Sequence, residues 1–229
     1  MPAYNEEEGI YNTVKDFLNQ EVVDEVIVVD NNSKDNTAKE AKSAGAIVYF
    51  EPKQGYGYAV QKAFRMALTR KADIIVNTES DSTFLGRDVY KLLPYLEDVD
   101  MVCGSRTHKV LVDKNAKMGP FLWWGNFALA KLLQFLYGSC QFTDIQCSLR
   151  AIRRNELKKI MPYLNEGGST FLTQMTILAI NKRLDIIEVP INYSERVGQS
   201  KITSTTFKSL IVGFKIIASL FKHKIMRGQ

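Results

Sequence analysis

Two acidic side chains, Glu79 and Asp81, stand one residue apart directly after the apolar run 73–77. That run predicts a buried strand, and in an extended backbone residues i and i+2 point to the same side. Both carboxylates can therefore converge on one object, and because like charges repel each other, a divalent cation is their usual compensation. A plain polar loop is the alternative, and it is the more common fate of an isolated acid-x-acid triplet. The rest of the sequence must decide between the two.

The composition is that of a globular chain, since 45% of the 229 residues are hydrophobic, which is enough for one sizeable core. The three cysteines, Cys103, Cys140 and Cys147, have no metal-ligand spacing, and their odd number favours a reducing compartment. No secretory signal opens the sequence, and no uninterrupted apolar stretch is long enough to span a bilayer. These features predict a cytoplasmic protein.

The net charge of +5 is concentrated at one end of the chain. Six lysines and arginines, and no acidic residue, follow Ser200, which leaves 24 basic against 25 acidic residues in the remainder. The basic character therefore belongs to the tail. We expect no nucleic-acid partner, because binding of that kind needs a broad basic surface.

Apolar runs that end in Asp or Asn alternate with helical patterns along the first half of the chain. This alternation is typical of a parallel α/β sheet, in which ligands bind at the carboxyl ends of the strands. Gly55 and Gly57 precede one of the helices; glycines permit a close backbone approach to a ligand, and a helix N-terminus favours phosphate. The expected strands are 25–30, 46–51, 73–77 and 185–193, and the expected helices include 38–44 and 59–69.

Five short motifs, taken in their order, resemble those of family 2 glycosyltransferases with the GT-A fold. They are Pro2-Ala-Tyr-Asn-Glu6, Val28-Val-Asp-Asn-Asn-Ser33, Gly55-x-Gly57, Glu79-x-Asp81 and Gly104-Ser-Arg106. In the second half, residues 143–153 and 188–201 are similar to the polyprenyl-phosphate branch, typified by dolichyl-phosphate mannose and glucose synthases. The resemblance implies a mostly parallel, Rossmann-like α/β sheet flanked by helices, with residues 1–200 forming the nucleotide-sugar-binding domain.

The resemblance also implies a donor site at the ends of the first strands. Glu79 and Asp81 match the acids that bind Mg²⁺ or Mn²⁺ on the donor diphosphate, where the cation neutralises the charge of the leaving nucleoside diphosphate. The other residues assigned to the nucleotide are Pro2, Tyr4, Glu6, Asp30, Lys53 and Gly55.

For the acceptor, the resemblance assigns Arg106 and Arg150 to a phosphate, since guanidinium forks match phosphate geometry. Asp144 matches a position close to the donor sugar, and with Asp81 and Arg106 it completes the expected catalytic set. A loop with Arg196, Ser200 and Lys201 is expected to close over the diphosphate or the acceptor phosphate. The alternatives are a surface salt bridge for Arg150 and a capping role for Asp144. For the loop with Arg196, Ser200 and Lys201, the alternative is that it contacts only solvent.

The sequence departs from the family pattern at four places. Glu79 replaces the usual Asp, Asn31 replaces a common Asp, and Thr83 stands where relatives often carry Gln or His. The fourth departure is the first strand, of which only about three residues remain, so that its neighbours in the sheet would lose a partner.

Two stretches suggest contact with a membrane surface. Residues 121–137 are rich in Leu and aromatic side chains, and Trp favours the bilayer interface. Residues 207–222, within the tail 201–229, form a basic amphipathic pattern typical of helices that lie in the interface plane. Packing on the protein's own core is the alternative for both. We therefore expect a peripheral association with the membrane.

Together these features predict an inverting transferase that moves a sugar from a UDP- or GDP-linked donor to a polyprenyl phosphate at the cytoplasmic membrane face. The acceptor phosphate is already anionic near neutral pH, so no strong general base is required. If the acceptor were a sugar hydroxyl instead, Asp144 would be the candidate base. The alternatives are transfer to a glycan or another lipid, a non-catalytic nucleotide-sugar binding protein, and a nucleotidyltransferase, whose Gly-rich N-terminal signature is missing.

Overall fold

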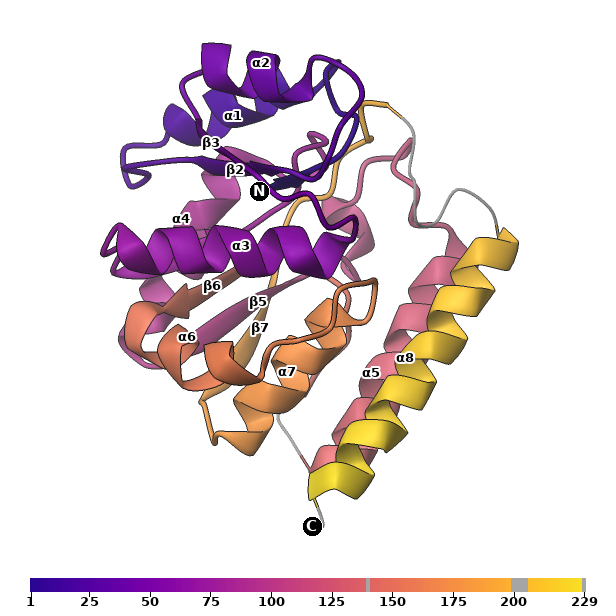
Figure 1. Ribbon diagram of the computed structural model, residues 1–229. Coiled ribbons are helices and arrows are strands. Elements are labelled where there is room, and N and C mark those ends of the chain that lie inside the picture. Colours follow the sequence, from indigo (N-terminus) through magenta and orange to yellow (C-terminus); the bar gives the residue numbers. More distant parts are fainter. Residues whose placement is uncertain (139–140, 199–205, 228–229) are drawn as a thin grey trace.

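The computed structural model describes residues 1–138, 141–198 and 206–227, the side chains of 226 and 227 excepted, as an α/β protein (Figure 1). Its strands form two sheets. The first has the order β1-β2-β3 and is parallel throughout, and the second has the order β4-β6-β5-β7. The strands are β1 (Pro2–Ala3), β2 (Ile27–Asp30), β3 (Ile47–Phe50), β4 (Ile74–Asn77), β5 (Met101–Ser105), β6 (Arg150–Arg153) and β7 (Ile186–Pro190).

Helices connect and cover these strands. In Figure 1, α3 lies in front of the strands, and α5 and α8 run side by side along one flank. The helices are α1 (Ile10–Leu18), α2 (Thr37–Ser43), α3 (Tyr56–Thr69), α4 (Val89–Leu92), α5 (Pro120–Tyr137), α6 (Arg154–Ile160), α7 (Phe171–Asn181) and α8 (Thr206–Arg227). The expected strands and helices therefore all form, with ends shifted by a few residues.

The first strand is short, as expected. Pro2 pairs with Val29 and Ala3 with Asp30, and β1 has no other strand partner in the described part of the chain. The described strands accordingly form two sheets, as the loss of a partner for the neighbours of a truncated first strand would allow. In the second sheet β6 runs antiparallel to both β4 and β5, while β5 and β7 are parallel, with β7 at the edge.

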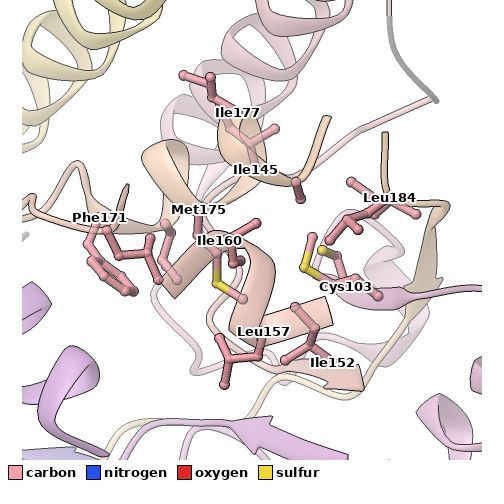
Figure 2. Packing of buried hydrophobic residues seen from close by; sticks show 14 of the residues in the cluster. Cys103, Ile145, Ile152, Leu157, Ile160, Phe171, Met175, Ile177 and Leu184 are labelled. Atoms are coloured by element: carbon pink, nitrogen blue, oxygen red, sulfur yellow. The ribbon is translucent and has the colours of Figure 1, made fainter. Parts of the chain in front are cut away.

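The largest hydrophobic cluster lies between the second sheet and helices α3, α5, α6 and α7. Figure 2 shows Ile152 of β6 and Cys103 of β5 close to Leu157 and Ile160 of α6 and Met175 of α7. All five side chains are buried. This packing fixes the strand ends from which the functional side chains project, because a close-packed interior permits little displacement.

Helix α8 packs on the protein through its buried residues Ile216 and Leu220, which join the large cluster. The Tyr137 hydroxyl at the end of α5 donates a 2.8 Å hydrogen bond to the carbonyl of Leu220. The expected domain boundary between residues 200 and 201 lies outside the described residues. Among the helices described, none combines the length and the apolar character needed to cross a bilayer.

Candidate active site

A cleft of about 700 Å³ opens where the carboxyl ends of β1 and β4 face helices α5 and α8. Its polar wall carries the carboxylates of Glu6, Glu79 and Asp81 and the guanidinium groups of Arg106 and Arg196. Its opposite wall is apolar and comes from the two helices. The residues of that wall include Phe121, Leu122, Leu129, Leu210, Phe214 and Ile217.

Asp81 is buried and is held by three donors. Its Oδ1 accepts hydrogen bonds from the Thr83 amide at 3.1 Å and from the Thr83 hydroxyl at 2.5 Å. Its Oδ2 accepts a hydrogen bond from Arg196, whose other terminal nitrogen donates to Glu6. Thr83, which departs from the family pattern, therefore orients Asp81 in this structure.

Glu79 lies half-buried on the same wall. Desolvation and the negative charge of Asp81 raise the pKa of the Glu79 carboxyl to about 7. The two carboxylates lie close enough for their negative charges to oppose each other. Carboxylate oxygens are the donors that Mg²⁺ and Mn²⁺ prefer, so the pair fits a divalent cation whose other ligands come from a bound diphosphate or from water. Within the described residues, no cluster of three or more His, Cys, Asp or Glu side chains forms a larger metal site.

The glycine loop is shaped by a neighbouring segment of the chain. Gly55 has φ +148°, and a Cβ there would lie 2.4 Å from the carbonyl oxygen of Gly167. At Gly57 a Cβ would lie 2.1 Å from the carbonyl of Glu166. The Gly57 amide donates to the Gly167 carbonyl at 2.9 Å. The glycines thus permit a close approach of residues 166–167, a reason the sequence alone did not indicate.

Asn31, one of the departures from the family pattern, lines the cleft and organises the same loop. Its amide nitrogen donates to the carbonyls of Glu51 at 3.0 Å and Lys53 at 2.8 Å, and its oxygen accepts from the Gly55 amide at 2.7 Å. Its place at the end of a strand, directly after Asp30, was the available signal. Further cleft residues outside the expected site include Gln146, Ser148 and Tyr193.

Arg106 reaches the cleft as the end of a buried chain of contacts. Its Nε and Nη2 donate to Asp144 at 2.7 and 2.9 Å, and its guanidinium lies 5.2 Å from the centre of the Tyr193 ring. Behind it, the Glu188 carboxylate accepts from the Asp144 amide at 2.7 Å and from the Thr143 amide at 2.8 Å. Glu188, which no motif singled out as functional, thus positions Asp144 and through it Arg106.

The structure corrects the expected position of Asp144. Its side chain is fully buried in the ion pair with Arg106 and does not line the cleft. Burial by itself would raise the pKa of the Asp144 carboxyl. The positive charge of Arg106 and its hydrogen bonds outweigh this effect and keep that pKa below its usual value. In this conformation Asp144 anchors an arginine, because the pairing satisfies both charges away from water.

Arg150 is a second correction, since its side chain is only 1% exposed and cannot reach a phosphate in the cleft. Its guanidinium donates to the carbonyls of Cys147 at 2.8 Å, Ile145 at 2.6 Å and Leu172 at 3.0 Å. It also donates to the Thr176 hydroxyl at 2.9 Å. Arg150 therefore ties the segment before β6 to helix α7, and neither phosphate binding nor a surface salt bridge describes it.

The other expected site residues divide into three groups. Pro2, Tyr4, Glu6, Gly55, Glu79, Asp81, Arg106 and Arg196 line the cleft. Asp30 and Lys53 lie outside the lining: Asp30 accepts a hydrogen bond from the Ser33 amide at 3.1 Å, and the Lys53 ammonium lies 3.9 Å from the centre of the Tyr58 ring. Ser200 and Lys201 lie outside the described residues.

Replacing Glu188 with alanine is expected to lower the free energy of unfolding by about 1–3 kcal/mol, because the amides of residues 143 and 144 would lose their acceptor. Glu188→Gln retains an oxygen acceptor and is expected to preserve most of the stability. Urea unfolding of both variants measures the difference. Equal losses in the two variants would show that the contacts to these amides contribute little.

Comparisons with known proteins identify the family and the fold of the chain. Residues 1–161 match the domain described as glycosyl transferase family 2. A dolichyl-phosphate hexose transferase of Haloferax volcanii is 34% identical over 88% of this chain and 84% of its own length. A UDP-N-acetylglucosamine–dolichyl-phosphate N-acetylglucosaminyltransferase of Methanococcus voltae is 29% identical over 98% of this chain and 94% of its own.

Among solved structures, glucosyl-3-phosphoglycerate synthase of Mycobacterium tuberculosis, in complex with Mn²⁺, uridine diphosphate and glucosyl-3-phosphoglycerate, superposes with a TM-score of 0.73. The identity is 21%, and the match covers 96% of this chain and 77% of that chain. The fold is therefore that of the GT-A glycosyltransferases. The chain belongs to glycosyl transferase family 2, which confirms the family indicated by the ordered motifs.

Proposed function

We propose that this protein transfers a sugar from a nucleoside-diphosphate sugar to a polyprenyl phosphate, with inversion at the anomeric carbon. The observation that carries the proposal is the two-sided cleft, in which a wall of carboxylates and arginines faces a wall of apolar helix residues. Such a cleft suits an acceptor with an anionic head and a hydrocarbon chain. Relatives named for transfer to dolichyl phosphate support the same acceptor class.

The donor diphosphate would lie against Glu79 and Asp81. A Mg²⁺ or Mn²⁺ ion held there with the diphosphate would supply compensation for the charge that develops on the leaving group. Arg196, at the same wall, adds a positive charge from the protein itself. Asn31 and the glycine loop that it fixes would shape the pocket for the nucleoside.

Arg106 would hold the acceptor phosphate, since it is presented to the cleft by a buried carboxylate. The structure supports a phosphate rather than a sugar hydroxyl as acceptor, because Asp144 is a poor base while it is paired with Arg106. A phosphate needs no deprotonation near neutral pH. Catalysis would then depend on positioning and on charge stabilisation, as preorganised sites allow.

The test is a transfer assay with radiolabelled UDP- and GDP-sugars. Polyprenyl phosphates and oligosaccharides are offered as acceptors in parallel, with Mn²⁺ or Mg²⁺ present. Label in the lipid-phosphate fraction is expected. Label found only in oligosaccharides would exclude polyprenyl phosphate as the acceptor and indicate a glycan acceptor. Donor binding without transfer to any acceptor would indicate a binding protein instead of an enzyme.

We further propose that helices α5 and α8 bring the cleft to the cytoplasmic membrane surface, with the protein associated peripherally. Two large apolar side chains of α8 are exposed: Phe207 is 72% and Phe214 is 69% exposed. On α5, Trp124 is 63% and Phe135 84% exposed. The lysines of α8 would add attraction to anionic lipid headgroups.

Phe214→Asp is expected to weaken binding to vesicles about tenfold, because burying a Phe side chain in an apolar phase contributes about 1.5–3 kcal/mol. Sedimentation with phosphatidylglycerol vesicles measures this effect. The matched control is Phe50→Asp, since Phe50 is 55% exposed on β3, away from α5 and α8. Equal losses in both variants, or none in Phe214→Asp, would contradict the proposed membrane surface.

A further inference from the structure

Arg196 occupies the position of a cation between two carboxylates of the cleft. Its terminal nitrogens donate to Asp81 Oδ2 and Glu6 Oε1, and its side chain is only 20% exposed. Asp81 is one of the two acids expected to hold a divalent cation. The positive charge of the guanidinium at Asp81 Oδ2 opposes a metal ion that approaches the same carboxylate, so the two compete for it.

The backbone holds Arg196 in this position. The Val197 amide donates to the Asp81 carbonyl at 3.1 Å, and the Ser194 amide donates to the Thr83 carbonyl at 2.9 Å. Val197 also lies against Gly9, where an added Cβ would come within 3.1 Å of the valine Cβ. Arg196 therefore belongs to a segment whose backbone is hydrogen-bonded to the loop that contains Asp81 and Thr83. Because this segment is already fixed, less conformational entropy is lost when the ion pairs form.

One donor of the arginine has no acceptor within the described residues. Arg196 Nε is buried and makes no hydrogen bond there. A buried donor without an acceptor is unfavourable, and a phosphate oxygen is the type of acceptor that a guanidinium binds with two parallel hydrogen bonds. The cleft thus offers Arg196 a second, anionic partner once a ligand is bound.

We propose that Arg196 keeps a free divalent cation away from Asp81, so that the cation enters together with a nucleoside diphosphate. In the complex, the diphosphate oxygens would accept the hydrogen bonds of the Arg196 guanidinium. The Asp81 carboxylate would then be available as a ligand for the cation. Arg196 therefore sets the order in which the two ligands bind. This inference rests on the proposed function for the metal site. It adds that the site prefers a cation accompanied by a nucleoside diphosphate over the free cation, a preference that two carboxylates without the arginine would lack.

The experiment measures Mn²⁺ binding without any sugar or acceptor, by the electron paramagnetic resonance signal of the free ion. Arg196→Met removes the charge while keeping an unbranched side chain. It is expected to tighten binding of Mn²⁺ alone about ten- to a thousandfold, the range by which an adjacent charge changes an ionisation equilibrium. With UDP or GDP present, the same variant is expected to bind Mn²⁺ no more tightly than the wild type.

Two further variants make the result specific. Arg65→Met, an exposed arginine on α3, is expected to leave Mn²⁺ binding unchanged. Asp81→Asn in the Arg196→Met background is expected to abolish the added affinity, which locates the ion at Asp81. Thermal melting of each variant verifies that it is folded.

The outcomes separate this inference from the proposed function. Unchanged or weaker binding of Mn²⁺ alone in Arg196→Met, with metal-dependent nucleotide binding intact in the wild type, would overturn the role of Arg196 alone. Absence of metal-dependent nucleotide binding in the wild type would overturn the donor site, and with it this inference. Tightening in the single variant that disappears in the double variant would support it.

Discussion

Arg150→Ala is expected to lower the free energy of unfolding by about 3–5 kcal/mol, the largest stability effect we expect from a single arginine in this chain. The substitution would leave three buried carbonyls, those of Ile145, Cys147 and Leu172, without their donor. It would also open a cavity between β6 and α7, because the side chain is almost fully buried. Urea unfolding followed by circular dichroism measures the loss.

The matched control is Arg153→Ala, three residues further along the chain. Arg153 is exposed, and its removal is expected to change stability by less than about 0.5 kcal/mol. If Arg150 were a phosphate ligand, its alanine variant would retain full stability and lose acceptor binding. That pattern would contradict the structural role and restore the interpretation from sequence.

Asp81→Asn is expected to abolish the metal-dependent stabilisation by UDP or GDP and to lower the transfer rate by about a thousandfold, since charge stabilisation of this kind is worth about 4 kcal/mol. The fold is expected to survive, because an asparagine oxygen still accepts from the Thr83 amide and hydroxyl. Thermal melting with each nucleotide, with and without Mn²⁺, measures the effect on binding.

Two variants calibrate this result. Asp98→Asn changes an exposed acid near the second sheet and is expected to leave the metal-dependent shift unaltered. Thr83→Val removes the hydroxyl that orients Asp81 and is expected to reduce the shift without abolishing it. A metal-dependent shift that persists in Asp81→Asn would exclude Asp81 as a ligand, and unfolding of that variant would assign it a structural role.

Much of the fold could be predicted because it depends on local patterns. Short apolar runs identified β2, β3 and β4, and such runs can be recognised from a few consecutive residues. The division into two sheets was not predicted. It depends on β1, whose two residues pair with β2 alone in the described chain.

The location of the site and many of its residues could be predicted, whereas the roles of several individual residues could not. Eight of the expected residues line the cleft, since strand ends of an α/β sheet gather at one edge. Glu188 was missed as a functional residue because its contribution is a contact with backbone amides of residues 143 and 144, which no side-chain pattern reveals.

The family, the acidic pair and the amphipathic pattern of the tail could be recognised from the amino-acid sequence, because each depends on residue type and short spacing. The difference between Arg106 and Arg150, which are alike in type, became visible only from the packing of the folded chain. The first is held at the cleft by Asp144, and the second is buried by helix α7. Likewise, the bridge from Arg196 to Glu6 joins residues 190 positions apart. Contacts of that range are set by how the elements pack, and local preference carries no information about them.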